Sequence, residues 1–151
     1  MRRDRNRTVL WIARFLIAAV TVMNIQAAFQ FMLRPQDFAP GFEMTGAAGE
    51  AMLQGMGLLF LMWNIPYVFA AVQPVRNFVS LIEAVIMQCI GVCGETLLLL
   101  GLPGEHPVLE ASVRRFILFD GAGLVVLFVT LVLIITMRRS RVPRPDGAGS
   151  I

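Results

Sequence analysis

Four long apolar stretches follow one another along the chain, and short polar segments separate them. Each stretch exceeds twenty residues, enough for a helix rising about 1.5 Å per residue to cross a hydrocarbon core about 30 Å thick. Backbone groups in lipid must bond to one another, and the two-residue alternation typical of membrane β-strands is absent. The pattern therefore predicts an all-α integral membrane protein with spans over residues 9–33, 51–72, 78–102 and 116–137.

The polar segments predict an antiparallel four-helix transmembrane bundle with short loops. Residues 34–50 are rich in Pro, Gly and acidic side chains, 73–77 form a tight turn, and 103–110 form a short polar loop. No internal repeat or separate soluble segment is evident, so residues 1–137 are expected to form a single domain. Residues 138–151 combine arginines with Pro and Gly, a composition typical of a disordered basic tail.

Arginine placement predicts the orientation of the bundle. The chain is 57% hydrophobic and only 15% charged, with a mean hydropathy of +0.72, whereas about 25% of the residues in a soluble domain are charged. With four spans, both termini and the 73–77 turn share one side, which collects most of the arginines. The positive-inside rule then places both termini in the cytoplasm of a bacterial inner (plasma) membrane. The opposite side holds Asp37, Glu43, Glu50, Glu105 and Glu110, an acidic outer face.

The first span has an alternative interpretation as a cleaved signal peptide. It has a basic start and an apolar run, with Ala27 and Ala28 after it. However, the run is long, Arg14 interrupts it, and Asn24-Ile25-Gln26 is not a small-residue cleavage site. The four-span interpretation is therefore favoured, although three spans starting outside also leave the C-terminus in the cytoplasm.

Polar side chains recur in the outer half of all four predicted spans. Gln88 and Glu95 lie seven residues apart on one face of the third span, with Gly91 between them, and Gln26 and Gln30 share a face of the first. Polar groups at this depth are expected to face inward, as packing contacts between helices or as a ligand site. The candidate outward-facing polar pocket comprises Gln26, Gln30, Gln54, Gln88, Glu95, Asp120, Arg114 and Arg115. Within it, Gln26 or Gln54 is the expected neighbour of Asp120.

One candidate ion pair lies nearer the cytoplasmic side. Arg14 on the first span and Glu83 on the third fall at similar depth. A lone charge there costs roughly 2.5–3.5 kcal/mol on insertion scales, and an opposite charge at the same depth relieves that cost. The alternative is that Arg14 extends to the inner headgroups while Glu83 is protonated or meets water.

The second span contains an irregular place at Trp63-Asn64-Ile65-Pro66-Tyr67. Pro66 removes one backbone donor and predicts a kink that frees the carbonyl of Met62, which Asn64 is near enough to satisfy. Trp63 and Tyr67 fit an inner interfacial position, where aromatic rings anchor a helix.

No residue pattern indicates catalysis, a metal site or a cofactor. Hydrolase, zincin, P-loop and CxxC motifs are absent, and no histidine lies within a span to bind haem. The only histidine, His106, is expected to be solvated in an outer loop. We therefore expect a small non-catalytic membrane protein that packs against itself or a partner complex. The alternatives are a small transporter or ligand binder using the polar pocket and a redox or quinone-linked subunit. The lipid bilayer is the expected partner, and nucleic acid is not, because arginines cluster only at the chain ends.

Overall fold

The computed structural model describes residues 2–140, and this part of the chain consists of helices and short connections without strands. Its elements are α1 (Arg2–Leu33), α2 (Pro35–Phe38), the 3-10 helix η1 (Ala39–Phe42), α3 (Gly46–Val72), α4 (Phe78–Gly101) and α5 (Pro107–Arg139). Four of them, α1, α3, α4 and α5, are long and apolar enough to cross a membrane.

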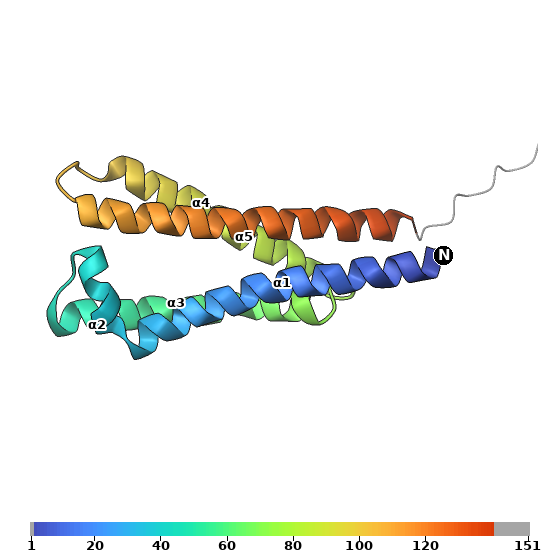
Figure 1. Cartoon of the computed structure of the whole chain (residues 1–151), viewed down its shortest axis with the longest axis horizontal. Coiled ribbons are helices and arrows are strands. Elements are labelled where there is room, and N and C mark those ends of the chain that lie inside the picture. The colour runs from blue at the N-terminus through green and yellow to red at the C-terminus, as the bar shows by residue number, and fades with distance from the viewer. Residues whose placement is uncertain (1, 141–151) are drawn as a thin grey trace, which may run out of the picture.

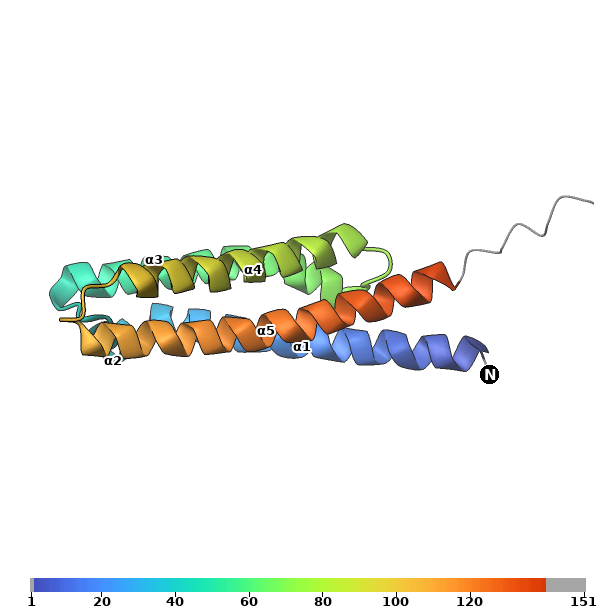
Figure 2. The same cartoon turned by 90° about the horizontal axis from the view of Figure 1, so that it is seen from above.

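The four long helices lie lengthwise beside one another (Figures 1 and 2). Helix α1 contacts α3 and α5, and α4 also contacts α3 and α5, so the order around the bundle is α1, α3, α4, α5. One end, here called the capped end, carries α2, η1 and the connection between α4 and α5 (Figure 1). The other, the terminal end, carries the start of α1, the end of α5 and the connection between α3 and α4.

Two apolar clusters fill the inside of the bundle. The terminal-end cluster is mainly aliphatic and includes Ile17, Leu81, Leu127 and Ile134, all fully buried. The capped-end cluster is aromatic and centres on the Phe31 ring, whose centroid lies 5.2–6.0 Å from those of Phe38, Phe42, Phe60 and Phe116. Ring pairs at such separations are favourable beyond the area they bury. These clusters leave the middle of the bundle for polar side chains.

Helix α1 is an integral part of both clusters. Ala13 and Ile17 are buried at the terminal end, and Ala28 and Phe31 are buried toward the capped end. Gly57 of α3 lies so close to α1 that an added Cβ would stand 2.6 Å from the Ala28 carbonyl oxygen. Loss of α1 by cleavage would expose these contact surfaces on α3 and α5.

Three of the four long helices, α1, α3 and α5, are longer than the apolar stretches that predicted them, whereas α4 matches its stretch to within one residue. Helix α3 begins at Gly46 rather than near residue 51, and α5 begins at Pro107 rather than near residue 116. The first turn of α3 is the weakly hydrophobic Gly-Ala-Ala-Gly, and the start of α5 includes Glu110, Arg114 and Arg115, so the apolar pattern does not detect these helix starts. Pro107 is well suited to the start of a helix because it lacks the N–H that would stay unpaired. Arg138 and Arg139, expected in the tail, form the last turn of α5. The predicted tail from residue 141 on lies outside the described residues.

Candidate functional site

Gln88 of α4 is the hub of a polar network in the middle of the bundle. Its side chain is 4% exposed. The Tyr67 hydroxyl of α3 donates to Gln88 Oε1 at 2.6 Å. Gln88 Nε2 donates to the backbone oxygen of Asp120 at 3.1 Å and to Asp120 Oδ1 at 2.9 Å. Three helices are thus joined by hydrogen bonds, and every polar atom of the Gln88 amide has a partner.

Two glycines make room for this network. A Cβ on Gly91 would lie 2.6 Å from Asp120 Oδ2, and a Cβ on Gly123 would lie 2.8 Å from Gln88 Nε2. Both distances are shorter than a carbon atom tolerates. The Asp120 carboxyl group therefore rests on the α4 backbone at Gly91, one helical turn from Gln88 and one turn from Glu95.

Around the Asp120 carboxyl group, hydrogen-bond acceptors outnumber donors. The carboxyl group of Glu95 adjoins that of Asp120, and Glu95 Oε2 is buried without a hydrogen-bond partner among residues 2–140. Both amide hydrogens of Gln88 are already directed at Asp120. No arginine forms an ion pair with either carboxyl group in the described part of the chain. We name Gln88, Glu95 and Asp120 the acid centre.

The other predicted pocket residues lie outside this centre. Gln26 and Gln30 are exposed on α1, and Gln54 Nε2 donates to the Met32 carbonyl at 3.4 Å, so Gln88 rather than Gln26 or Gln54 is the neighbour of Asp120. Arg114 forms an ion pair with Glu110, one turn away, at 3.6 Å. Arg115 forms neither an ion pair nor a hydrogen bond through its side chain within residues 2–140.

Arg14 and Glu83 are not joined by an ion pair in the described structure. Arg14 Nε instead donates to the Ala71 carbonyl at 3.3 Å, and its guanidinium lies 4.5 Å from the centroid of the Trp11 ring. Glu83 is exposed on α4. Helices α1 and α4 make no direct contact around the bundle, which accounts for the separation of these two charges.

Asn64 and Pro66 lie within α3, which runs uninterrupted through both residues. Asn64 Nδ2 donates to the Phe60 carbonyl at 2.7 Å, not to the carbonyl of Met62 as predicted. Tyr67 also differs from its expected interfacial role. Its ring is 3% exposed, and its hydroxyl points inward to Gln88. The periodicity of α3 indicates this inward orientation, because Tyr67 lies on the same face as buried Asn64 and Ala70.

A cavity of about 450 Å³ lies at the capped end between α1 and α5, under α2 and η1. Five aromatic rings line it: Phe31, Phe38, Phe42, Phe116 and Phe119. Its polar lining includes Gln30, Asp37, Ser112 and Arg115. Of the predicted pocket residues, the cavity therefore brings together only Gln30 and Arg115. An adjoining hollow of about 410 Å³ shares Gln30, Asp37 and Phe38 with it and adds Gln26 and Arg34.

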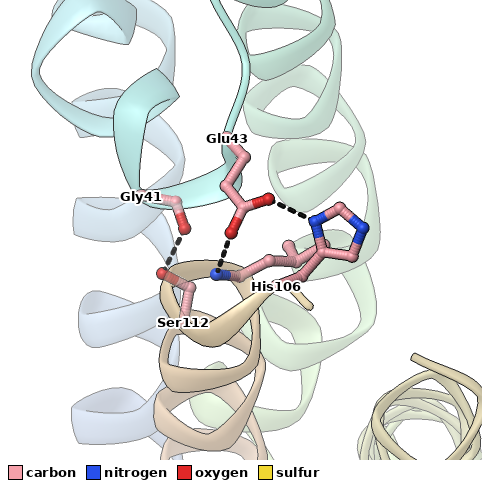
Figure 3. A network of polar contacts seen from close by, with 5 residues as sticks. Gly41, Glu43, His106 and Ser112 are labelled. Atoms are coloured by element: carbon pink, nitrogen blue, oxygen red, sulfur yellow. Dashed lines mark hydrogen bonds and ion pairs between the residues drawn. The ribbon is translucent and has the colours of Figure 1, made fainter. Parts of the chain in front are cut away.

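A set of polar contacts fastens the cap over this cavity (Figure 3). The Glu43 carboxylate lies 2.5 Å from His106 Nδ1 and accepts the Leu109 backbone N–H at 3.2 Å. The Ser112 hydroxyl donates to the Gly41 carbonyl at 2.6 Å. Contact with His106 lowers the pKa of Glu43 below its ordinary value. His106, expected to be solvated, is thus part of a clamp that joins two loops sixty-three residues apart.

Sequence reasoning did not reveal this clamp, because loop-to-loop contacts have no periodic signal. Glu43 has a left-handed backbone with φ of 55°, which is uncommon outside glycine. Comparison with known proteins adds no further constraint: no protein-family model, curated protein or solved structure matches this chain.

Proposed function

We propose that the chain is a multi-pass inner-membrane protein whose four long helices cross the bilayer as an antiparallel bundle with both termini in the cytoplasm. Their length and apolar character support the spans. The arginines near the terminal end support the orientation, since cytoplasmic segments are enriched in Arg and Lys. The capped end then faces outward. Burial of α1 against α3 and α5 supports its retention as a span.

We further propose that the bundle is a small ligand binder or transporter, and that the acid centre binds a positively charged group. The observation that carries this proposal is the acceptor surplus at Glu95 and Asp120. Two adjoining carboxyl groups cannot both remain ionised in a partly desolvated place without a counter-charge. A shared proton or the ammonium group of a ligand supplies that charge. Binding and release of such a group needs no catalytic residue.

The test is a thermal-shift screen of the detergent-purified protein with small amines, using choline, ethylamine and spermidine as probes. At least one amine at saturating concentration should raise the unfolding temperature by about 5 °C, the scale expected for a ligand at roughly a hundred times its Kd. Glu95→Gln and Asp120→Asn should abolish the shift. Glu83→Gln is the matched control, because it removes an exposed carboxylate from the same helix. Equal shifts in all variants, or none in the wild type, would contradict the proposal.

A second candidate function is a non-catalytic packing protein. The saturated hydrogen bonding from Tyr67 through Gln88 to Asp120 favours it, since such contacts hold membrane helices together. In that case no amine should stabilise the protein, and Glu95→Gln should leave the unfolding temperature equally insensitive to added amines.

A further inference from the structure

The capped-end cavity has apolar walls and a charged rim. Five aromatic rings form its walls, those of Phe31, Phe38, Phe42, Phe116 and Phe119, and no residue of α3 or α4 lines it. It is therefore bounded by two neighbouring helices and the cap alone. A volume of about 450 Å³ lies within the range of roughly 300–1,000 Å³ that small-molecule sites occupy. Such walls suit a hydrocarbon chain.

The rim carries both signs of charge, and its charged side chains have no ion-pair or hydrogen-bond partners among the described residues. Arg115 lines the cavity, Arg34 lines the adjoining hollow, and Asp37 lines both. All three side chains are exposed, and none forms a hydrogen bond or ion pair within residues 2–140. Neighbouring Arg114, by contrast, is paired with Glu110. Guanidinium groups bind phosphate through paired hydrogen bonds, and a carboxylate binds an ammonium group.

We propose that the two hollows hold one phospholipid of the outer leaflet whose headgroup carries both a phosphate and a primary amine. Arg115 and Arg34 bind the phosphate, Asp37 binds the amine, and an acyl chain lies against the phenylalanine rings. This inference rests on the proposed membrane placement, which puts the capped end at the outer headgroups, and is independent of the acid centre. An unpaired carboxylate between two arginines matches a zwitterionic headgroup better than a purely anionic one.

The experiment is native mass spectrometry of the protein purified in mild detergent, followed by titration of delipidated protein with phosphatidylethanolamine or phosphatidylglycerol. The wild type should retain one phosphatidylethanolamine per chain and prefer it to phosphatidylglycerol. Arg115→Gln should lower the retained lipid by about tenfold, the loss expected for one charge-assisted contact. Arg114→Gln, which removes the same charge outside the cavity, should retain as much as the wild type. Asp37→Asn should abolish the preference between the two lipids.

Several outcomes would overturn the proposal. Equal lipid retention by the Arg115 and Arg114 variants would show that Arg115 does not bind the headgroup. Equal binding of the two lipids by the wild type would show that Asp37 does not bind the amine. Displacement of the lipid by free phosphoethanolamine at equal concentration would show that the apolar walls take no part. Unchanged unfolding temperatures of the delipidated variants verify that the fold is intact. Glu95→Gln should retain as much lipid as the wild type, so a negative amine screen does not bear on the lipid site. Membrane fractionation tests the membrane placement separately.

Discussion

At the scale of single residues, the network around Gln88 depends on the absence of side chains at two positions. Gly91 and Gly123 bring a carboxyl group and an amide against helix backbone, where any β-carbon would collide with them. Hydrogen bonds between membrane helices contribute modestly on average, about 0.6 kcal/mol. An added methyl group at either glycine would have to displace the polar side chain that it meets, so the hydrogen bonds of the network depend on both glycines.

Gly91→Ala should destabilise the folded protein by about 1–3 kcal/mol, because the new methyl group overlaps Asp120 Oδ2 and forces a shift. Gly94→Ala is the matched control on the same helix, since a Cβ there meets no atom within 4 Å. The control should be neutral or stabilising by up to about 1 kcal/mol through helix propensity. Thermal unfolding in detergent measures both, and equal effects would disprove the close contact.

Tyr67→Phe should destabilise the protein by roughly 0.6–2 kcal/mol, because Gln88 Oε1 loses its donor inside the bundle. The same substitution in a Gln88→Leu background should cost less, since the oxygen left without a donor is then absent. Unfolding of all four proteins in one detergent provides the coupling energy. Additive effects would show that the hydroxyl and the amide do not interact.

The sequence identified the chemistry at this scale but not the pairing. Gln88, Glu95 and Asp120 stand out as polar residues in apolar segments, and their inward orientation follows from the cost of exposing them to lipid. Which of them meet depends on helix rotation and on order around the bundle. Because α1 and α4 are not neighbours, Arg14 and Glu83 lie apart although the sequence predicts a similar depth for them. The position of a residue along its helix can be counted from the sequence, but the direction in which it faces its neighbours cannot.

At the scale of elements, the cap is a short helical segment held by hydrogen-bond contacts in addition to its aromatic packing. Glu43 and His106 join η1 to the start of α5, and Ser112 adds a hydrogen bond to Gly41 (Figure 3). Hydropathy predicted only a polar loop here, and missed α2 and η1 because elements of four residues have too few positions to show a period.

The cap should loosen in acid. Contact with His106 lowers the pKa of Glu43 from 4.5 in the folded state, so the stability it contributes is complete above about pH 4.5 and is lost as the pH falls through the lowered value. Hydrogen exchange of residues 34–45 should accelerate below pH 4.5 beyond the intrinsic trend. Glu43→Gln should remove this dependence, whereas Asp37→Asn, a cap carboxylate outside the clamp, should preserve it. A Glu43→Gln protein with the wild-type profile would contradict the assignment.

At the scale of the whole molecule, the four long apolar helices were predictable and are present, because apolar runs of this length have few alternative structures. Their ends were less predictable, as the Gly- and Ala-rich first turn of α3, the charged residues near the start of α5 and the arginine-containing last turn of α5 show. The order around the bundle was not predictable from the apolar pattern, since α3 and α4 have hydrophobic residues on nearly every face.

The proposed topology predicts reporter locations. Reporters fused at Met1 and at Ile151 should both be active only in the cytoplasm, and one inserted after Gly46 should be active only outside. An uncleaved α1 should keep the N-terminal reporter attached to a full-length product on a denaturing gel. Termini on opposite sides of the membrane, or a shortened product, would reject the four-span arrangement.

The contact between Gly91 and Asp120 also has a consequence for which sequences are permitted. The side chains at these two positions occupy one shared space, so a larger side chain at one position requires a smaller side chain at the other. In a library that randomises both positions, alanine or serine at 91 should survive selection for folded protein only with a residue smaller than aspartate at 120. Substitutions at the two positions, 29 residues apart in the chain, would then be correlated among the folded variants.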